Sequence, residues 1–325
     1  IAADVHGKNH HKRGSFRNYI MELTIIDENK KLIKCSKKKN SDLFNYTIGG
    51  MGLTGIIYSC KFKLIKINSH LIEQKIIKSA NLKKKIQNIK KNNNYEYNVA
   101  WIDTSANNKS IGRSILFSGN HLKKEKKEIK KIFFKKRSLR VFNIFPNWIL
   151  NSFTIKLLNT FLYNFTPESK KELNINDYFY KLDKIKNSNI LYGKKGFISY
   201  QFAIPYKNSE KGIMEILKVL QTNKVFSFVS GLKSLGRNDG FLSFGIKGFT
   251  LVFDFPIYKN IHEVLDKVDD IVIRYKGKIY LTKDSRIKSN KFKKMKSGFK
   301  NKKFLEIRKN KKKNFLSLQA ERLEI

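Results

Sequence analysis

Cysteine and long apolar runs are scarce in this sequence. Its only cysteines are Cys35 and Cys60, and two thiols cannot build a disulfide scaffold. Nothing resembles a signal peptide, so a reducing cytoplasm is the expected compartment. There is no run of about 18 uninterrupted apolar residues, which argues against a membrane-spanning helix. The nearest approach, residues 144–165, is expected to be a core helix or a substrate-covering loop, with a helix on a membrane surface as the alternative.

Acidic residues are also few: 26 Asp and Glu stand against 68 Lys and Arg, which gives a formal net charge of +42. Such an excess is typical of proteins that bind nucleic acid or an anionic membrane. Lysine supplies most of the excess, and Asn and Ile are also frequent. These three residues are the ones that A/T-rich codons encode. The lysines are scattered rather than grouped with Arg and aromatic residues. Nucleic-acid binding is therefore the weaker interpretation, whereas a general attraction to anions remains.

The second half of the chain carries an internal repeat. With 325 residues and 41% hydrophobic content, the chain can form two domains with full cores. A strand–helix–strand pattern is expected at residues 196–232 and again at residues 249–282. This order is that of the ferredoxin-like split repeat, whose helices cover one sheet face. The other face is left free to close over a ligand.

The first half is expected to alternate strands with short helices. The basic segment at residues 122–140 is predicted to be an exposed helix or a mobile loop, with a lid or membrane-facing surface as the alternative. The basic tail at residues 288–313 is predicted to be a helical segment that packs back on the first domain. The remaining expected elements are a helical turn at residues 42–46, a helix at 80–91, and strands at 19–26, 31–35, 56–67, 70–79, 95–103 and 114–119.

The opening stretch, Ile1–His11, concentrates chemically active groups. A short apolar strand is expected first, after which Gly7 opens a loop that lets a planar ligand approach the main chain. Three histidines and Lys8 lie within six residues and can hold an anionic or redox-active ring. A hairpin loop with chance histidines is the plain alternative. Zinc would need His6 and His10 on one helix face, and Gly7 argues against a helix there, so no metal is expected.

Residues 48–55 form a second glycine-rich stretch. Small side chains let the backbone touch a ligand or another segment, although a glycine turn between strands explains the stretch equally well. It is not a dinucleotide-binding fingerprint, because the glycine spacing differs and a strand rather than a helix is expected to follow.

Several segments, in order along the chain, resemble one family. Ala2–His11, followed by Gly14–Phe16, resembles the flavin-contact segment of the decaprenylphosphoryl-ribose oxidase family, a branch of the FAD-linked oxidases of vanillyl-alcohol-oxidase type. Ordered matches spread over nearly the whole chain are more specific than any one glycine motif. The further matching segments are Gly49–Ile57, Tyr200–Phe202 with Ile204-Pro205, Asp254–Ile257 and Tyr280–Arg286.

The resemblance implies an α+β fold in two parts. Residues 1–68 are expected to be the C-terminal part of an FAD-binding domain, residues 69–287 a substrate (cap) domain with ferredoxin-like repeats, and residues 288–325 a basic segment packing on the FAD domain. Related proteins carry a further lobe upstream that holds the FAD pyrophosphate. Because the chain begins with Ile inside a strand-like segment, we expect it to be a fragment or an N-terminally truncated product.

The resemblance also assigns FAD contacts. His6 is expected to pack against the flavin ring and orient it without a covalent bond. The opening loop and the strand end at Tyr280 are expected to meet across a flat slot wide enough for an isoalloxazine. The expected FAD contacts are Ala3, Asp4, Val5, His6, Gly7, Gly52, Gly55, Ile57 and Tyr280.

By the same resemblance, Lys8, Gln201, Lys233 and Lys283 line the substrate side. Taken alone, Gln201 would be a sheet-face amide and each lysine a surface charge. The implied reaction is oxidation of a secondary alcohol of a sugar or a sugar-phosphoryl polyprenyl lipid, with hydride passing to flavin N5. Lys283 is the first candidate to accept the hydroxyl proton or to stabilise the alkoxide. His6 completes the expected catalytic pair.

The sequence departs from the family pattern at Thr250 and Val252, where Asn and Cys are usual, so a more apolar active-site wall is expected. Aldonolactone oxidation therefore stays open as an alternative. A non-catalytic basic fragment that binds nucleic acid or anionic lipid is the alternative of another class. The family further implies a short-chain reductase partner that completes an epimerisation, and peripheral association with the inner membrane.

Overall fold

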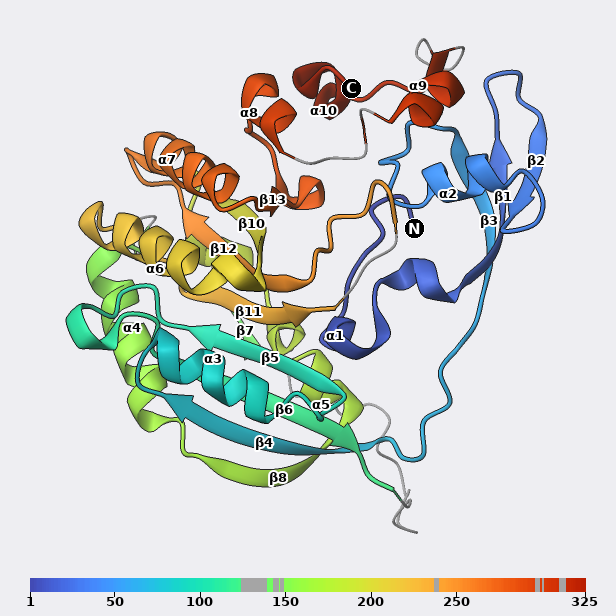
Figure 1. Cartoon of the computed structure of the whole chain (residues 1–325). Coiled ribbons are helices and arrows are strands. Elements are labelled where there is room, and N and C mark those ends of the chain that lie inside the picture. Colours follow the sequence, from blue (N-terminus) through green and yellow to red (C-terminus); the bar gives the residue numbers. More distant parts are fainter. Residues whose placement is uncertain are drawn as a thin grey trace.

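The computed structural model of the chain has an α+β architecture (Figure 1), as the sequence predicts. Helices and strands occur in separate layers, and two main sheets carry the strands. The structure describes residues 1–123, 139–142, 146, 149–236, 240–295, 299, 301–309 and 314–325.

The larger sheet has eight strands, and its pairings are antiparallel. One half of this sheet belongs to the repeat in the second half of the chain, and the other half comes from earlier segments. In spatial order the strands are β13 (Lys278–Ile279), β10 (Phe197–Pro205), β12 (Gly248–Pro256), β11 (Val229–Leu235), β5 (Tyr97–Ile102), β6 (Ser114–His121), β4 (Leu71–Ser79) and β8 (Ser169–Asn174).

The ferredoxin-like repeat is present. Helix α6 (Tyr206–Thr222) connects β10 to β11, and helix α7 (Ile261–Arg274) connects β12 to β13. The spatial order β13-β10-β12-β11 is that of a split β-α-β repeat. The last strand is shorter than expected. It ends at Ile279, and a 3-10 helix, η5 (Leu281–Lys283), follows. The main-chain N–H of Tyr280 donates the last hydrogen bond to β10, at the carbonyl of Gln201, and the main chain turns directly after it.

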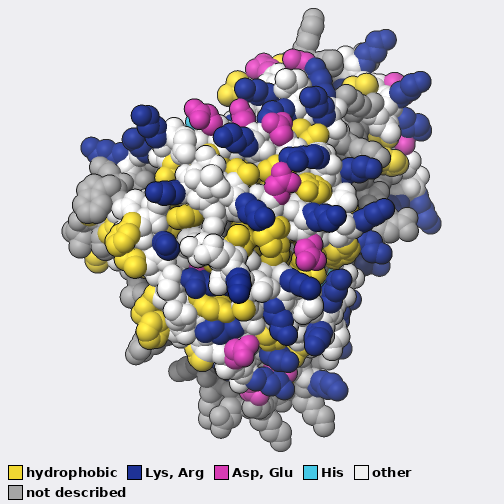
Figure 2. Space-filling model, turned by 60° about the vertical axis from the view of Figure 1, so that its left-hand side comes forward, with side chains coloured by type: hydrophobic (Ala, Val, Ile, Leu, Met, Phe, Trp, Pro, Cys, Tyr) yellow, Lys and Arg dark blue, Asp and Glu magenta, His cyan; other side chains and the backbone are white. Residues whose placement is uncertain are grey.

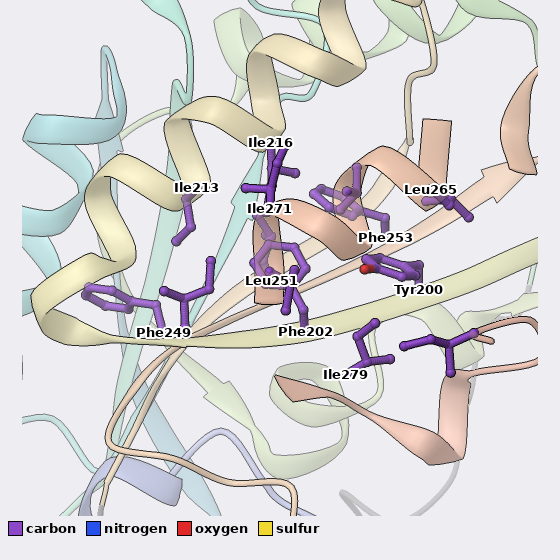
Figure 3. Close-up of a cluster of buried hydrophobic side chains, with 14 of the residues drawn as sticks. Tyr200, Phe202, Ile213, Ile216, Phe249, Leu251, Phe253, Leu265, Ile271 and Ile279 are labelled. Atoms are coloured by element: carbon purple, nitrogen blue, oxygen red, sulfur yellow. The ribbon is translucent and has the colours of Figure 1, made fainter. Parts of the chain in front are cut away.

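Apolar side chains at helical spacing explain why α6 and α7 pack on one face of this sheet. They form the inner side of the largest hydrophobic core. Figure 3 shows the side chains that fill this space, namely Tyr200, Phe202, Ile213, Ile216, Phe249, Leu251, Phe253, Leu265, Ile271 and Ile279.

Alternation along β10 places the remaining side chains on the opposite face. Tyr200 and Phe202 are in the core below the helices, whereas Ala203 packs in a separate cluster with Leu235, Phe244 and Tyr280. Gln201 is buried at 3% exposure and shares the face of Ala203. This face, away from α6 and α7, meets the N-terminal segment.

The smaller sheet has the order β2-β1-β3. Its strands are β1 (Ile20–Ile26), β2 (Leu32–Ser36) and β3 (Ile56–Phe62), and α2 (Ser41–Thr47) packs beside them. Strand β3 ends five residues before the expected position, Ile67. An extended connection then leads to β4 (Figure 1). The domain boundaries expected at residues 68 and 287 stay a prediction.

One other expectation about the elements needs correction. Residues 1–3 form no strand. Instead, the opening segment makes a turn, an isolated bridge between His6 and Ser15, and the helix α1 (His10–Arg13). The basic segment 122–140 lies almost wholly outside the described residues. The other elements are α3 (Leu82–Lys91), α4 (Ser152–Phe165), α5 (Ile175–Phe179), α8 (Ser289–Lys294), α9 (Lys302–Lys309), α10 (Leu318–Leu323), β7 (Leu139–Arg140), β9 (Ile185–Lys186), η1 (Phe16–Tyr19), η2 (Asn108–Ser110), η3 (Leu182–Lys184) and η4 (Ser188–Tyr192).

The C-terminal helices return to the body of the molecule. Phe292, Phe304 and Leu323 are buried in the largest core. The Tyr46 hydroxyl of α2 donates a 2.7 Å hydrogen bond to Asn301. Figure 1 accordingly shows α8, α9 and α10 lying over α7 and beside α2.

The surface is basic throughout the view in Figure 2, where Lys and Arg are spread among other side chains with fewer acidic groups between them. Within the part of the chain that the structure describes, no helix has both the length and the apolar character needed to cross a bilayer.

Candidate functional site

The opening loop reaches the free face of the ferredoxin-like strands through His6. Its Nε2 lies 3.0 Å from Nε2 of Gln201 on β10, and its Nδ1 lies 3.3 Å from Nζ of Lys233 on β11. The His6 ring also packs 5.3 Å from the ring of Tyr280 and 5.7 Å from that of Phe244. Residues almost 280 positions apart in the sequence therefore meet at one histidine.

Asp4 holds this loop in place. Its buried carboxylate accepts hydrogen bonds from the Ser15 hydroxyl at 2.8 Å, from the Arg17 main-chain N–H at 2.9 Å, and from the Ser243 hydroxyl. Its backbone has a positive φ of 42°, a conformation that non-glycine residues rarely adopt. The Asp4 carboxylate, an expected FAD contact, thus already accepts hydrogen bonds from the protein, and these bonds fix the shape of the loop.

A second anchor comes from His10. Its Nδ1 accepts a 3.0 Å hydrogen bond from the main-chain N–H of Gly236, directly after β11. An added Cβ at Gly236 would lie 2.9 Å from the carbonyl of His11, so the close approach of α1 to this strand end requires glycine. The helix begins at His10, so His6 and His10 do not share a helix face. The described residues hold no group of three or more His, Cys, Asp or Glu placed to bind a metal.

Gln201 is fixed by Thr250 on the neighbouring strand. The Gln201 Nε2 lies 2.9 Å from Thr250 Oγ1, which in turn lies 2.8 Å from the carbonyl oxygen of Phe202. Thr250 stands opposite Lys233 in the β11–β12 ladder. Thr250 was expected to make the active-site wall more apolar, but its hydroxyl instead hydrogen-bonds Gln201 and orients it.

Positive charge surrounds His6. Burial is the main reason why the pKa of His6 lies well below its usual value, and the charges of Lys233, His10 and Lys283 act in the same direction. Burial, followed by the charges of Lys283 and Lys8, lowers the pKa of Lys233 to about 8. His6 is therefore a neutral imidazole at pH 7. The charge of Lys283 acts on both groups, so the strand end and the opening loop do come together.

Lys283 differs from Lys233 in its contacts. Its side chain makes no hydrogen bond or ion pair with any residue that the structure describes, whereas the turn that carries it is held firmly. The amide of Gln319 on α10 donates to the carbonyls of Leu281 and Asp284 at 2.7 and 3.1 Å. Arg322 on the same helix makes a 2.7 Å ion pair with Asp284. The C-terminal helix thus positions the free lysine.

Lys8 lies at the edge of this cluster. Its Nζ donates a 2.9 Å hydrogen bond to the carbonyl of Tyr178 and lies over the rings of Tyr178 and Phe179 at 4.8 and 5.1 Å. Burial, and next the charge of Lys181, lowers its pKa to about 8. The structure therefore ties Lys8 to α5, and its role on the substrate side stays a prediction.

The flat slot expected between His6 and Tyr280 is absent, because the two rings are in contact. A small pocket lies beside Tyr280 instead, and His6 is not among the described residues that line it. Its lining joins Ala3 and Tyr280, both expected FAD contacts, to the glycine turn through Gly49 and Met51. The lining is mostly apolar, as the site of a flat ring would be.

The other expected FAD contacts divide into two groups. Gly52 has a φ of +81° and nothing within 4 Å of an added Cβ, and Val5 is 46% exposed, so both remain open to a ligand. In contrast, a Cβ at Gly55 would lie 2.5 Å from Ile25, and Ile57 packs in the core of the smaller sheet. The structure does not bring Gly55 and Ile57 to the His6 cluster. Gly7, at the bend of the loop, faces the Asn9 side chain.

Sequence reasoning missed Phe244, which packs on both His6 and Tyr280, and the anchoring role of Thr250. Phe244 carried no signal, because it lies in the irregular connection between β11 and β12. Thr250 could have been found from strand register, since it follows the alternation that places Gln201 and Lys233 on one face.

No family model matches the chain. It is 30% identical over 303 residues to the decaprenylphosphoryl-beta-D-ribose oxidase of Mycolicibacterium smegmatis, a match that covers 90% of this chain. The chain spans 65% of the length of that relative. It is also 21% identical over 308 residues to a Streptomyces coelicolor protein described as an uncharacterized protein in the mprA 5' region, covering 89% of this chain and 82% of that protein. Together with the ordered motifs, this similarity confirms the resemblance to decaprenylphosphoryl-ribose oxidases.

Proposed function

We propose that this chain forms part of an FAD-dependent oxidoreductase that oxidises a secondary alcohol of a sugar or a polyprenyl-phosphoryl sugar. The observation that carries the proposal is the cluster in which a neutral, buried His6 lies between Gln201 and Lys233, with the charge of Lys283 acting on His6 from close by. The Mycolicibacterium relative is an oxidase of a decaprenylphosphoryl sugar, which supports the same class.

The residues present fit a flavin ring. Ala3 and Tyr280 line a mostly apolar pocket, and Gly52 leaves open space where another residue would carry a Cβ. Aromatic and small side chains at such a pocket would hold the ring, and His6 would orient it from behind Tyr280. When bound, FAD supplies the acceptor for the hydride that leaves the carbinol carbon.

The protein's own groups would bind and orient the alcohol. Gln201 can hydrogen-bond a sugar hydroxyl once the substrate competes for its amide. Lys283, which has no partner among the described residues, can stabilise the negative charge that develops on the substrate oxygen. Lys8 and Lys181 add positive charge nearby, which suits a substrate that carries phosphate.

Two partners follow from this proposal. A short-chain reductase would consume the keto product and complete an epimerisation. A lipid surface would deliver the substrate, and α4 offers a stripe that suits it. Phe153, Leu157, Phe161 and Phe165 recur every four residues and are 55–71% exposed. The core helix expected here is thus buried on only one side, through Ile155 and Asn159.

The test is bleaching of the flavin absorbance. We expect the chain loaded with FAD to be yellow and to lose its visible absorbance when a polyprenyl-phosphoryl pentose is added without oxygen. Lys283→Gln should slow bleaching by about 10²–10³-fold, the range for losing one group that stabilises charge on a substrate oxygen. The control Lys259→Gln, at an exposed position before α7, should bleach normally.

Two outcomes would contradict this function. One is equal bleaching by wild type and Lys283→Gln. The other is a colourless chain that retards DNA in a salt-dependent way, which would favour a basic binding protein.

A further inference from the structure

The hydrogen bonds behind His6 form a chain with a fixed direction. The chain starts at the carbonyl oxygen of Phe202, which can only accept. The hydroxyl of Thr250, 2.8 Å away, therefore donates its single hydrogen to this carbonyl. Toward Gln201, at 2.9 Å, Thr250 can then act only as an acceptor. Hence Gln201 presents its amino group, not its carbonyl oxygen, to this side.

The same direction continues into the imidazole. An amide nitrogen has two hydrogens. One goes to Thr250, and the other points at Nε2 of His6, 3.0 Å away. That ring nitrogen must be the acceptor. A neutral imidazole has one N–H, so in His6 the hydrogen is on Nδ1, which faces Nζ of Lys233 at 3.3 Å.

Lys233 must then offer a lone pair. We propose that this hydrogen-bond chain holds Lys233 as a neutral amine, that Thr250 is the positioning residue that fixes its direction, and that Lys233, not Lys283, accepts the hydroxyl proton of the substrate. The surroundings agree with a neutral amine. Burial and the charges of Lys283 and Lys8 lower the pKa of Lys233 to about 8, so the neutral amine is the main form above that pH, and no acidic group contributes to keeping it charged.

The opposite arrangement needs more changes. A charged Lys233 would donate to Nδ1 of His6, and the ring hydrogen would move to Nε2. Gln201 would then have to present its carbonyl oxygen both to His6 and to Thr250. In turn, the Thr250 hydroxyl would have to turn away from the Phe202 carbonyl, which would lose this bond inside the sheet. A buried polar group left unpaired destabilises the arrangement that contains it.

The role in the reaction rests on the proposed function, whereas the direction of the hydrogen bonds does not. With FAD bound as the hydride acceptor, Lys233 would take the hydroxyl proton on its lone pair as the substrate O–H bond breaks and the carbonyl forms. Because an amine has one lone pair, the substrate hydroxyl replaces the Nδ1–H of His6 as its donor. Lys283 faces the developing oxygen charge.

The experiment needs neither flavin nor substrate. The ring hydrogen of His6 is located by long-range proton–nitrogen correlation on ¹⁵N-histidine-labelled chain, with His6→Gln to assign the signals. Titration of Lys233 is followed at the carbon next to its amine, with Lys233→Gln for assignment. For wild type, we expect a Lys233 titration near pH 8, in line with its pKa of about 8, and the His6 hydrogen on Nδ1 above that pH.

Thr250 is tested by a matched pair. Thr250→Ser keeps the hydroxyl and should behave as wild type. Thr250→Val keeps the shape and removes the acceptor, so Gln201 can turn over. We then expect the His6 hydrogen to move to Nε2 and the Lys233 titration to shift upward. Wild-type His6 with its hydrogen on Nε2, or Thr250→Val without effect on either signal, would overturn the inference. The wild-type measurement decides alone if Thr250→Val fails to fold.

Failure here is distinct from failure of the proposed function. A chain that bleaches with substrate but carries the His6 hydrogen on Nε2 keeps its activity and loses this role for Lys233. A chain that never bleaches but shows the predicted tautomer keeps the hydrogen-bond direction.

Discussion

Single residues at this site are constrained by burial and charge rather than by metal ligation or acidic partners. His6 and His10 are both held neutral in the fold, in each case chiefly by burial. His10 also uses a ring nitrogen as an acceptor from Gly236. Histidines of this kind favour the folded state only while they stay unprotonated, which makes stability depend on pH.

His10 gives a pH prediction. Burial, its largest cause, lowers the pKa of His10 from 6.5 to about 4, although the charge of Asp4 acts in the opposite direction. The unfolded chain therefore takes up this proton at a higher pH than the fold does. The stabilisation is complete above about pH 6.5 and is lost as the pH falls toward 4. At about 1.4 kcal/mol per pKa unit, the loss is at most about 3 kcal/mol.

Urea unfolding at several pH values measures this effect. His10→Asn keeps an acceptor for Gly236 but cannot take up the proton, so its stability should fall less between pH 7 and about pH 4.5. His262→Asn, at an exposed position on α7, is the control and should follow wild type. Equal pH dependence of wild type and His10→Asn would contradict the assignment.

At the scale of elements, helix α4 makes the clearest prediction. An apolar stripe on a helix of a strongly basic protein is suited to the interface of an anionic membrane. Phe161→Ser removes the centre of the stripe, where Phe161 stacks on Phe165 at 4.4 Å. Because burying a Phe side chain contributes about 1.5–3 kcal/mol, we expect roughly tenfold weaker binding to phosphatidylglycerol vesicles.

Co-sedimentation with vesicles is the measurement. Leu318→Ser is the matched control, because Leu318 is 85% exposed on α10, away from the stripe. It should bind as wild type does. Equal loss in both variants, or equal binding to phosphatidylcholine vesicles, would show that the stripe does not dock on an anionic lipid surface.

Elements with strong periodicity were predictable from the sequence. The spacing of Ile213, Ile216, Leu217 and Leu220 identifies the buried face of α6, and all four are buried. Where local signals were weak, tertiary contacts decided. The strand end at Tyr280 turns early because α10 binds the carbonyls of Leu281 and Asp284. That contact is remote in sequence, so no local pattern could predict it.

At the site, too, motifs identified some residues, whereas contacts between distant segments determined the rest. The residue types at His6, Gln201 and Lys233 were recognised from motifs, and the structure places them in contact. The contact between His6 and Tyr280, which replaces the expected slot, depends on Phe244 filling space beside both rings. The polar role of Thr250 depends on cross-strand register. Both follow from packing between segments, which a linear sequence does not display.

At the scale of the whole molecule, the central feature is the meeting of the first ten residues with the end of the ferredoxin-like repeat. This meeting joins the smaller sheet to the larger one and creates the pocket beside Tyr280. The chain spans 65% of the length of its Mycolicibacterium relative. The flavin site proposed above is formed by residues at the junction between the two sheets.

An FAD titration followed by the NMR signals of ring and methyl groups tests this claim most directly. FAD should shift the signals of Ala3, Tyr280 and His6, whereas AMP, which lacks the flavin ring, should leave all three unchanged. Signals at Trp101, on the far half of the larger sheet, serve as the internal control. Unchanged signals at Ala3 and Tyr280 with saturating FAD, or equal shifts with AMP, would contradict a flavin site at this junction.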